Sequence, residues 1–107
     1  MKGNHVLLIG YVASDLIVKK EENRHRTRLR VATHYPCRRP SGTHEWRTVW
    51  HDVVAWDKTA DYAERNFVKG SRIMIEGSIN YRSYADKMGH TRYITEITAQ
   101  SLTNLDR

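Results

Sequence analysis

The sequence is poor in cysteine and lacks long apolar runs, and each shortage removes a class of protein. Its single cysteine, Cys37, cannot form an internal disulfide, which suits a reducing cytosol. It has no run of about 18 apolar residues, so no transmembrane helix is expected. The apolar stretch in M-K-G-N-H-V-L-L-I-G at the start is too short for a signal peptide. These absences favour a cytoplasmic protein with no membrane partner.

Signatures of catalysis and of cofactor binding are also missing. Neither of the glycine-rich phosphate-binding patterns, G-x-x-x-x-G-K and G-x-G-x-x-G, occurs. His34, Cys37 and His44 lack the paired spacing of zinc sites. No orienting acid or oxyanion element accompanies Cys37 and His34, so a nucleophile and base pair is disfavoured. The sequence therefore predicts no enzyme, no cofactor and no metal site.

Positive charge and tryptophan are what the sequence does have. Its net charge is +6, and 12 of its 18 basic residues are arginine. Trp46, Trp50 and Trp56 have one parity, so a regular strand would carry all three rings on one face. Aromatic rings within positive charge are typical of single-stranded nucleic-acid binding, with rings stacking on bases and cations following phosphates. Packing in the core or at a subunit interface is the alternative.

A second row of equal parity holds Arg24, Arg26, Arg28 and Arg30, opposite Leu29 and other apolar residues. The guanidinium groups could follow a phosphate backbone. Alternatively, they could form a solvated strand edge that prevents aggregation between sheets. Arg38 and Arg39 lie in the segment 36–44, whose Pro, Gly and Ser predict an exposed, flexible basic loop.

The order of elements predicts an all-β fold in a single domain over residues 1–107. Strands are expected over residues 5–20 (with a bulge or bend at Gly10), 24–35, 47–56, 71–84 and 91–102. The expected helix covers residues 57–70, with Asp57 as its N-terminal cap, Ala60, Ala63 and Phe67 as its apolar stripe, and Gly70 as its left-handed C-terminal residue. Residues 85–89 should form a hairpin turn. One helix between the third and fourth of five strands is the arrangement of the OB-fold, a small Greek-key barrel.

Several motifs resemble the bacterial single-stranded DNA-binding protein (SSB) family. The most specific is W-H-x-V-V at residues 50–54, followed by K-G-x-x-x-x-I-E-G at residues 69–77. N-x-V-x-L-I-G (residues 4–10), V-A-T (31–33) and R-Y-x-T-E (92–96) extend the similarity over nearly the whole chain. The resemblance implies largely sequence-independent binding of single-stranded DNA in replication, recombination or repair, near the nucleoid. It also implies a homo-oligomer, most often a tetramer and less often a dimer.

The resemblance implies roles for individual residues. Bases would stack on Trp50, Trp56 and Tyr84. Cys37 takes the place of a further family aromatic, and Trp46, Tyr35 or Tyr81 could compensate. The residues expected to contact phosphates are Lys58, Lys69 and Arg82, together with Arg28 and Arg30 from the arginine row. His51 takes the place of a family histidine near subunit contacts.

Two departures from the family pattern affect this interpretation. Asp52 stands where the family often has a basic residue, and its charge opposes an anionic ligand. Many members also end in an acidic, apolar tail that recruits other proteins, whereas this sequence ends at S-L-T-N-L-D-R and is expected to lack that function. A primosome-like OB-fold adaptor that mainly binds protein is the alternative function.

Overall fold

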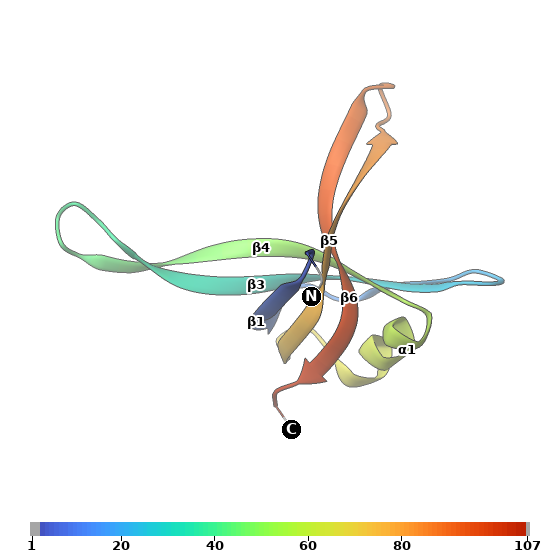
Figure 1. Cartoon of the computed structure of the whole chain (residues 1–107), viewed down its shortest axis with the longest axis horizontal. Coiled ribbons are helices and arrows are strands. Elements are labelled where there is room, and N and C mark those ends of the chain that lie inside the picture. The colour runs from blue at the N-terminus through green and yellow to red at the C-terminus, as the bar shows by residue number, and fades with distance from the viewer. Residues whose placement is uncertain (1–2, 107) are drawn as a thin grey trace.

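The computed structural model describes residues 3–106, which contain six strands and one helix (Figure 1). They are β1 (Val6–Val12), β2 (Ile17–Lys20), β3 (His25–Arg38), β4 (His44–Trp56), α1 (Asp57–Asn66), β5 (Arg72–Ala85) and β6 (Thr91–Asn104). Among these residues no helix is long and apolar enough to cross a membrane.

The strands form one sheet that closes into a barrel. The sheet order is β1-β5-β6-β4-β3-β2, and β1 also pairs with β3. The first predicted strand is split: β1 pairs with β5 as far as Tyr11 and with β3 at Tyr11 and Val12, and the chain then pairs with β3 again as β2. Gly10 lies at this crossing, where a Cβ atom would overlap the carbonyl oxygen of Ala32. The predicted OB-fold barrel of five strands, with the helix after the third, is confirmed because β1 and β2 together serve as its first strand.

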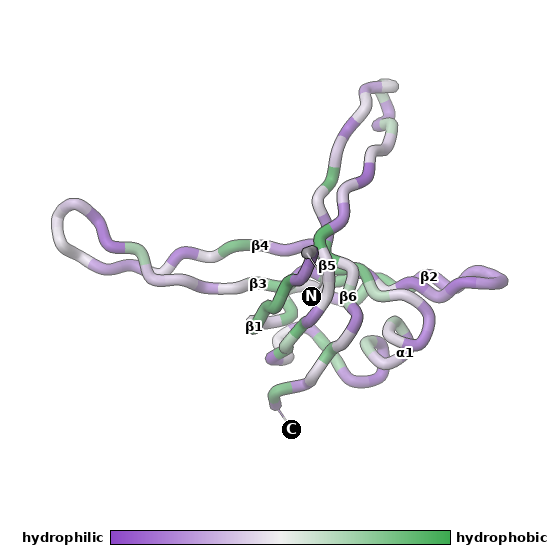
Figure 2. The backbone as a smooth tube through the Cα atoms, in the orientation of Figure 1, coloured by the Kyte–Doolittle hydropathy of each residue, from purple (hydrophilic) through white to green (hydrophobic). Residues whose placement is uncertain are grey.

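The barrel interior is apolar, and the helix closes one end of it. Val31, Val53, Ile73 and Ile75 are fully buried, or nearly so, in the interior. The predicted stripe of Ala60, Ala63 and Phe67 is confirmed, since all three side chains belong to the same core. Figure 2 shows hydrophobic segments meeting at the barrel and hydrophilic residues toward the outlying turns.

The start of α1 differs from the prediction. The capping residue is Trp56, and no side chain caps the helix among the described residues. Asp57 instead has a left-handed backbone (φ 53°), and its carboxylate accepts a hydrogen bond from the backbone N–H of His25 (3.1 Å). It also pairs with Arg24 (3.1 Å), and these contacts lower its pKa, the backbone bond being the larger cause. Asp57 therefore fastens the helix to the turn before β3.

The end of α1 also differs. The helix stops at Asn66 because the Val68 N–H donates to Ser71 Oγ (3.0 Å) and buried Phe67 is extended. Gly70 is left-handed as expected (φ 96°), but it lies in the turn to β5, where its N–H donates to the Val12 carbonyl (2.7 Å).

The expected loop over residues 36–44 is shorter than predicted. Pro36 to Arg38 belong to β3 and pair with Trp46 to His44 of β4, which leaves only residues 39–43 as a turn. We call the outer part of this hairpin, residues 33–49, the β3–β4 arm. The outer part of the second hairpin, residues 80–96, is the β5–β6 arm. The two arms leave the barrel in different directions (Figure 1).

Candidate nucleic-acid interface

Strand register places most of the predicted contact residues on one face of the sheet. Residues opposite each other in an antiparallel pair share a face. Even-numbered residues of β3 and β4 are paired in this way, and the Val54–Thr98 pair extends the same face to β6 and then β5. We call this side, opposite the barrel core, the outer face. It includes Arg26, Arg28, Arg30, Trp46, Trp50, Asp52, Trp56, Arg82, Tyr84, Arg92 and Glu96.

The three tryptophans share the outer face, as parity predicted. The β3–β4 register continues without a shift from the Arg26–Trp56 pair to the Arg38–His44 pair. Trp46 is 73% exposed and Trp50 is 54% exposed, while Trp56 is partly covered. At about 3.4 Å per residue, the rings stand roughly 14 and 20 Å apart along the strand. Each ring is therefore positioned to meet a different part of an extended ligand.

Arginine side chains lie over two of these rings. The Arg30 guanidinium is 5.4 Å from the centre of Trp50. That of Arg24 is 4.4 Å from the centre of Trp56, with Arg26 at 6.0 Å. Cation–π attraction of this kind orients the ring and places positive charge beside it.

A single carboxylate organises the centre of the outer face. Glu96, only 8% exposed, accepts from Arg28 Nη2 through one oxygen and from Arg82 Nε through the other, each at 3.2 Å. Three elements, β3, β5 and β6, are joined in this way. Two guanidinium groups share one negative charge, so positive charge remains at this point.

Asp52 is a second acidic group on the outer face. Its Oδ1 lies 3.5 Å from Arg30 Nε, and both side chains are about half exposed. The contact partly neutralises the arginine that lies over Trp50. Asp52 would therefore oppose an anionic ligand specifically at Arg30, as its departure from the family pattern suggested.

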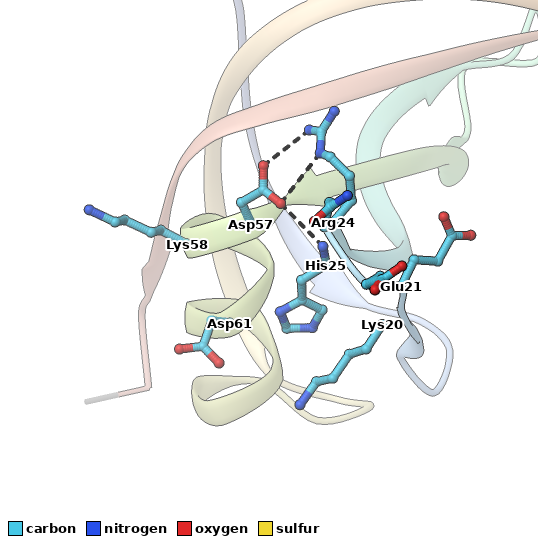
Figure 3. Close-up of a pocket in the computed structure, with 9 residues that line it drawn as sticks. Lys20, Glu21, Arg24, His25, Asp57, Lys58 and Asp61 are labelled. Carbon is cyan, nitrogen blue, oxygen red and sulfur yellow. Dashed lines mark hydrogen bonds and ion pairs between the residues drawn. The ribbon is translucent and has the colours of Figure 1, made fainter.

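The remaining predicted contact residues are more dispersed. Lys58 is exposed on the first turn of α1 and points away from Arg24 and Asp57 (Figure 3). Lys69 lies beyond the other end of the helix, about 15 Å along its axis, so the structure does not bring it to the tryptophan row. Tyr84, 48% exposed, lies on the β5–β6 arm.

The turn of the β5–β6 arm is held by Asp86. Its carboxylate accepts from Arg92 Nε (2.8 Å) and from the backbone N–H groups of Met88 and His90 (2.9 Å each). These bonds, that from Arg92 first, hold the Asp86 pKa below its ordinary value. The expected hairpin turn is thereby confirmed, and Tyr84 stands just before it.

Sequence reasoning missed the role of Glu96 and the exposed ring of Tyr93. Glu96 was noted only as part of R-Y-x-T-E, although it joins Arg28 to Arg82. Tyr93 is 82% exposed on the other face of the β5–β6 arm, together with Tyr81, the substitute aromatic that the sequence suggested, which is 77% exposed. Their odd numbers, against the even number of Tyr84, were the available signal that they lie on the opposite face from Tyr84.

The barrel topology and its neighbours define the class and then the family. The chain is an OB-fold protein with an aromatic and basic outer face. It belongs to the single-strand binding protein family, whose model matches residues 3–105.

Curated relatives agree with this assignment. A single-stranded DNA-binding protein of Rhizobium meliloti is 36% identical over 96% of this chain and 63% of its own length. Single-stranded DNA-binding protein 1 of Chlorobaculum tepidum is 34% identical over 95% and 64%, respectively. A Bacteroides thetaiotaomicron relative is 36% identical over 98% and 67%. The chain thus spans about two thirds of the length of these relatives.

Solved structures support the fold. A Plasmodium falciparum SSB in complex with ssDNA superimposes with a TM-score of 0.89 and 26% identity, covering 99% of this chain and 97% of that one. A Thermus aquaticus single-stranded DNA-binding protein, 22% identical, has a TM-score of 0.82 over 95% of this chain and half of its own.

Proposed function

We propose that this protein binds single-stranded DNA, without catalysis and with little sequence preference, in bacterial replication, recombination or repair at the nucleoid. The observation that carries the proposal is the outer face, where the tryptophans of β4, two of them exposed, lie beside the arginines of β3 on one continuous sheet surface. Family membership and a structural neighbour in complex with ssDNA support it.

In the proposed mechanism, bases stack on rings and phosphates meet cations. Trp50, Trp56 and Tyr84 serve as stacking surfaces, with Trp46 extending the row along the β3–β4 arm. Stacking contributes about 1–3 kcal/mol per base, and every base has a flat face, so sequence matters little. Arg28, Arg30, Arg82, Lys58 and Lys69 contact phosphates. Arginine has five N–H donors, so an arginine bound to a carboxylate retains donors for a phosphate.

The test is a tryptophan fluorescence titration with oligo-dT, oligo-rU and duplex DNA at two salt concentrations. Stacking should quench the emission on addition of oligo-dT, and the duplex, whose bases are already stacked, should have little effect. Affinity should fall with salt because bound phosphates release counterions. An absence of quenching at low salt would contradict base stacking. It would favour the alternative, an adaptor whose outer face binds protein.

Substitution of Trp50 sharpens the test. Trp50→Ala should weaken oligo-dT binding by roughly 1–3 kcal/mol, the range for one lost stacked base. Trp50→Phe keeps a flat ring and should retain most of the affinity. Binding is measured by anisotropy of labelled oligo-dT, which does not depend on tryptophan emission. Equal loss in both variants would contradict stacking at this position.

We also propose that the protein is a homo-oligomer, with a tetramer favoured over a dimer. Leu7, Ile9 and Tyr11 are 55%, 54% and 43% exposed on the outer side of β1, beside Met74 of β5. Contiguous exposed apolar residues of this kind mark interaction surfaces. Association would place several binding faces in one particle, so that individually weak contacts add through effective concentration.

A further inference from the structure

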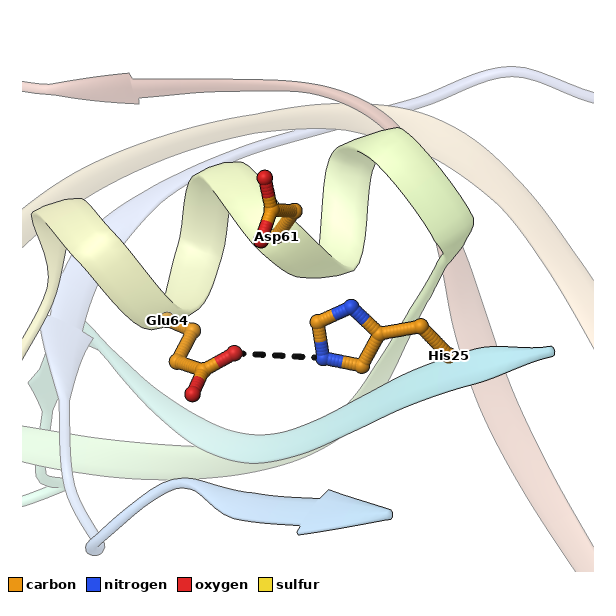
Figure 4. Close-up of side chains that lie close together, drawn as sticks. All are labelled: His25, Asp61 and Glu64. Carbon is orange, nitrogen blue, oxygen red and sulfur yellow. Dashed lines mark ion pairs between the residues drawn. The ribbon is translucent and has the colours of Figure 1, made fainter. Parts of the chain in front are cut away.

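Three potential metal ligands converge between α1 and the start of β3, away from the outer face. His25, Asp61 and Glu64 each offer one ligand atom, and these atoms lie within 4.8 Å of one another (Figure 4). The Nε2 atom of His25 is 3.2 Å from a Glu64 oxygen. An imidazole with two carboxylates is a mixed nitrogen and oxygen ligand set that suits divalent first-row transition metals.

The fold positions these ligands without relying on the cluster itself. Asp61 and Glu64 are three residues apart on α1 and therefore share a face of the helix. The His25 backbone is fixed twice, by its pairing with Lys20 and by the hydrogen bond from its N–H to Asp57. The imidazole is thus directed at the helix from a rigid strand (Figures 3 and 4).

The His25 ring nitrogen is poorly satisfied by the protein. The His25 side chain is only 15% exposed. Its Nε2 atom is buried, and no group of the described residues meets it with the geometry of a hydrogen bond. A buried polar atom without a partner is destabilising. Because an unprotonated nitrogen facing a carboxylate oxygen is repulsive, a proton or a cation between them would stabilise the arrangement.

We propose that His25, Asp61 and Glu64 bind a divalent transition metal ion, with Zn²⁺ as the physiological candidate. Ligand atoms lie about 2.0–2.2 Å from Zn²⁺, so the three side chains would draw together by roughly 1 Å. The carboxylates can make this movement, since the side chains of Asp61 and Glu64 are 44% and 36% exposed. Water completes the coordination from an open pocket of about 460 Å³ that His25 and Asp61 help to line.

Two cations compete with a metal at this site. The Arg65 guanidinium lies 3.2 Å from the Asp61 carboxylate. The Lys20 ammonium lies 3.6 Å from the Glu64 carboxylate. The metal must displace this charge, so removal of Lys20 should strengthen metal binding. This effect has the opposite sign to the loss of a ligand, which makes it a useful second test.

The bound metal would connect α1 to β3 beside a stacking position. His25 is next to Arg24, whose guanidinium lies 4.4 Å from the centre of Trp56. A metal bridge would therefore stiffen the segment that carries Arg24. The metal site does not depend on the proposed DNA binding, and its test uses no DNA.

The experiment titrates Co²⁺, an absorbing substitute for Zn²⁺, into the EDTA-treated and dialysed full chain. The visible absorption of Co²⁺ reports nitrogen and oxygen coordination directly, and thermal melting with Zn²⁺ gives a second readout. The wild type should bind one Co²⁺ per chain, and its melting temperature should rise with Zn²⁺. His25→Gln and Glu64→Gln should each lose about tenfold or more in Co²⁺ affinity.

Glu21→Gln is the matched control, because Glu21 lines the same pocket and the same charge is lost. It should bind Co²⁺ as the wild type does, and Lys20→Met should bind it more tightly. The proposal is overturned if the wild type gives no Co²⁺ spectrum, or if His25→Gln binds as well as Glu21→Gln. The exposed position of Glu64 on the helix keeps the test valid even if His25→Gln fails to fold.

Discussion

Arginine residues on the outer face already have protein partners, and this decides how much charge is free for a ligand. Arg28 and Arg82 share Glu96, whereas Arg30 has Asp52 to itself. Glu96 is nearly buried and joins strands, so its loss would disturb the sheet. Asp52 is half exposed, and its removal changes the charge of the face with little effect on the fold.

Asp52→Asn should therefore strengthen binding of oligo-dT. Exposed ion pairs are weak, so freeing Arg30 should improve the affinity by only about two- to fivefold. The salt dependence should become steeper because one more cation can meet a phosphate. Fluorescence titration at two salt concentrations measures both quantities. Asp15→Asn removes the same charge from an exposed site before β2, and it should have a smaller effect.

His51 gives the fold a specific pH dependence. Its Nε2 lies 2.8 Å from Thr33 Oγ1, and burial lowers its pKa below the ordinary value of 6.5, partly offset by Asp52. The folded state thus binds fewer protons than the unfolded state as pH falls through this range. The contribution of neutral His51 to the stability of the fold is therefore fully present above about pH 6.5, and it is lost progressively as the pH falls below that value.

Melting temperatures at pH 7.5 and 5.5 test this dependence. The wild type should melt at a lower temperature at pH 5.5, and His51→Gln should show a smaller decrease. His44→Gln, at the exposed base of the β3–β4 turn, should retain the wild-type difference. An unchanged difference in His51→Gln would assign the pH effect to other groups.

At the scale of elements, the β5–β6 arm depends on its own turn for order. The turn relies on the Asp86 carboxylate, which accepts from Arg92 and from two backbone N–H groups. Asp86→Ala removes all three bonds. Amide hydrogens of Met88 and His90 should then exchange several-fold faster, as measured by hydrogen exchange and mass spectrometry. Lys87→Ala, in the same turn, is the control and should leave the exchange rates unchanged.

The elements also show what local sequence patterns can predict. The sequence could predict that the three tryptophans of β4 share a face, because side chains alternate regularly along the strand through Trp46, Trp50 and Trp56. The end of α1 was not, because it depends on Ser71 capturing the Val68 N–H. Pro36 suggested a loop, yet the chain continues as strand because β4 pairs with it all the way to the turn.

At the scale of the whole molecule, association should depend on the outer side of β1. Ile9→Glu places a charge among exposed apolar residues and should shift the particle toward monomers in sedimentation velocity. Val68→Glu is the control: Val68 is 70% exposed but lies between α1 and β5. A wild-type particle that is already monomeric would contradict the proposed oligomer.

The complete site could be predicted only in part, because its contacts depend on the fold of the whole molecule. Sequence patterns and the family resemblance identified Trp50, Trp56, Arg28 and Arg82 one by one. The convergence of Arg28 and Arg82 on Glu96 brings together residues 68 and 14 positions apart in the chain. Contacts of that range depend on the closed barrel, which local periodicity does not encode.

The two arms are joined at the barrel by a narrow seam. β4 and β6 pair in parallel through only two residue pairs, Val53–Ile97 and Val54–Thr98. Beyond that seam, on the outer face, the Arg28–Glu96–Arg82 contacts connect the hairpin that carries Trp46 to the one that carries Tyr84. A change in the angle between the arms would strain this seam and the Glu96 contacts, while β1, paired with both β5 and β3, holds the barrel closed and each hairpin keeps its own ladder. We therefore expect the angle between the β3–β4 arm and the β5–β6 arm to vary, so that the protein can follow both straight and bent DNA strands.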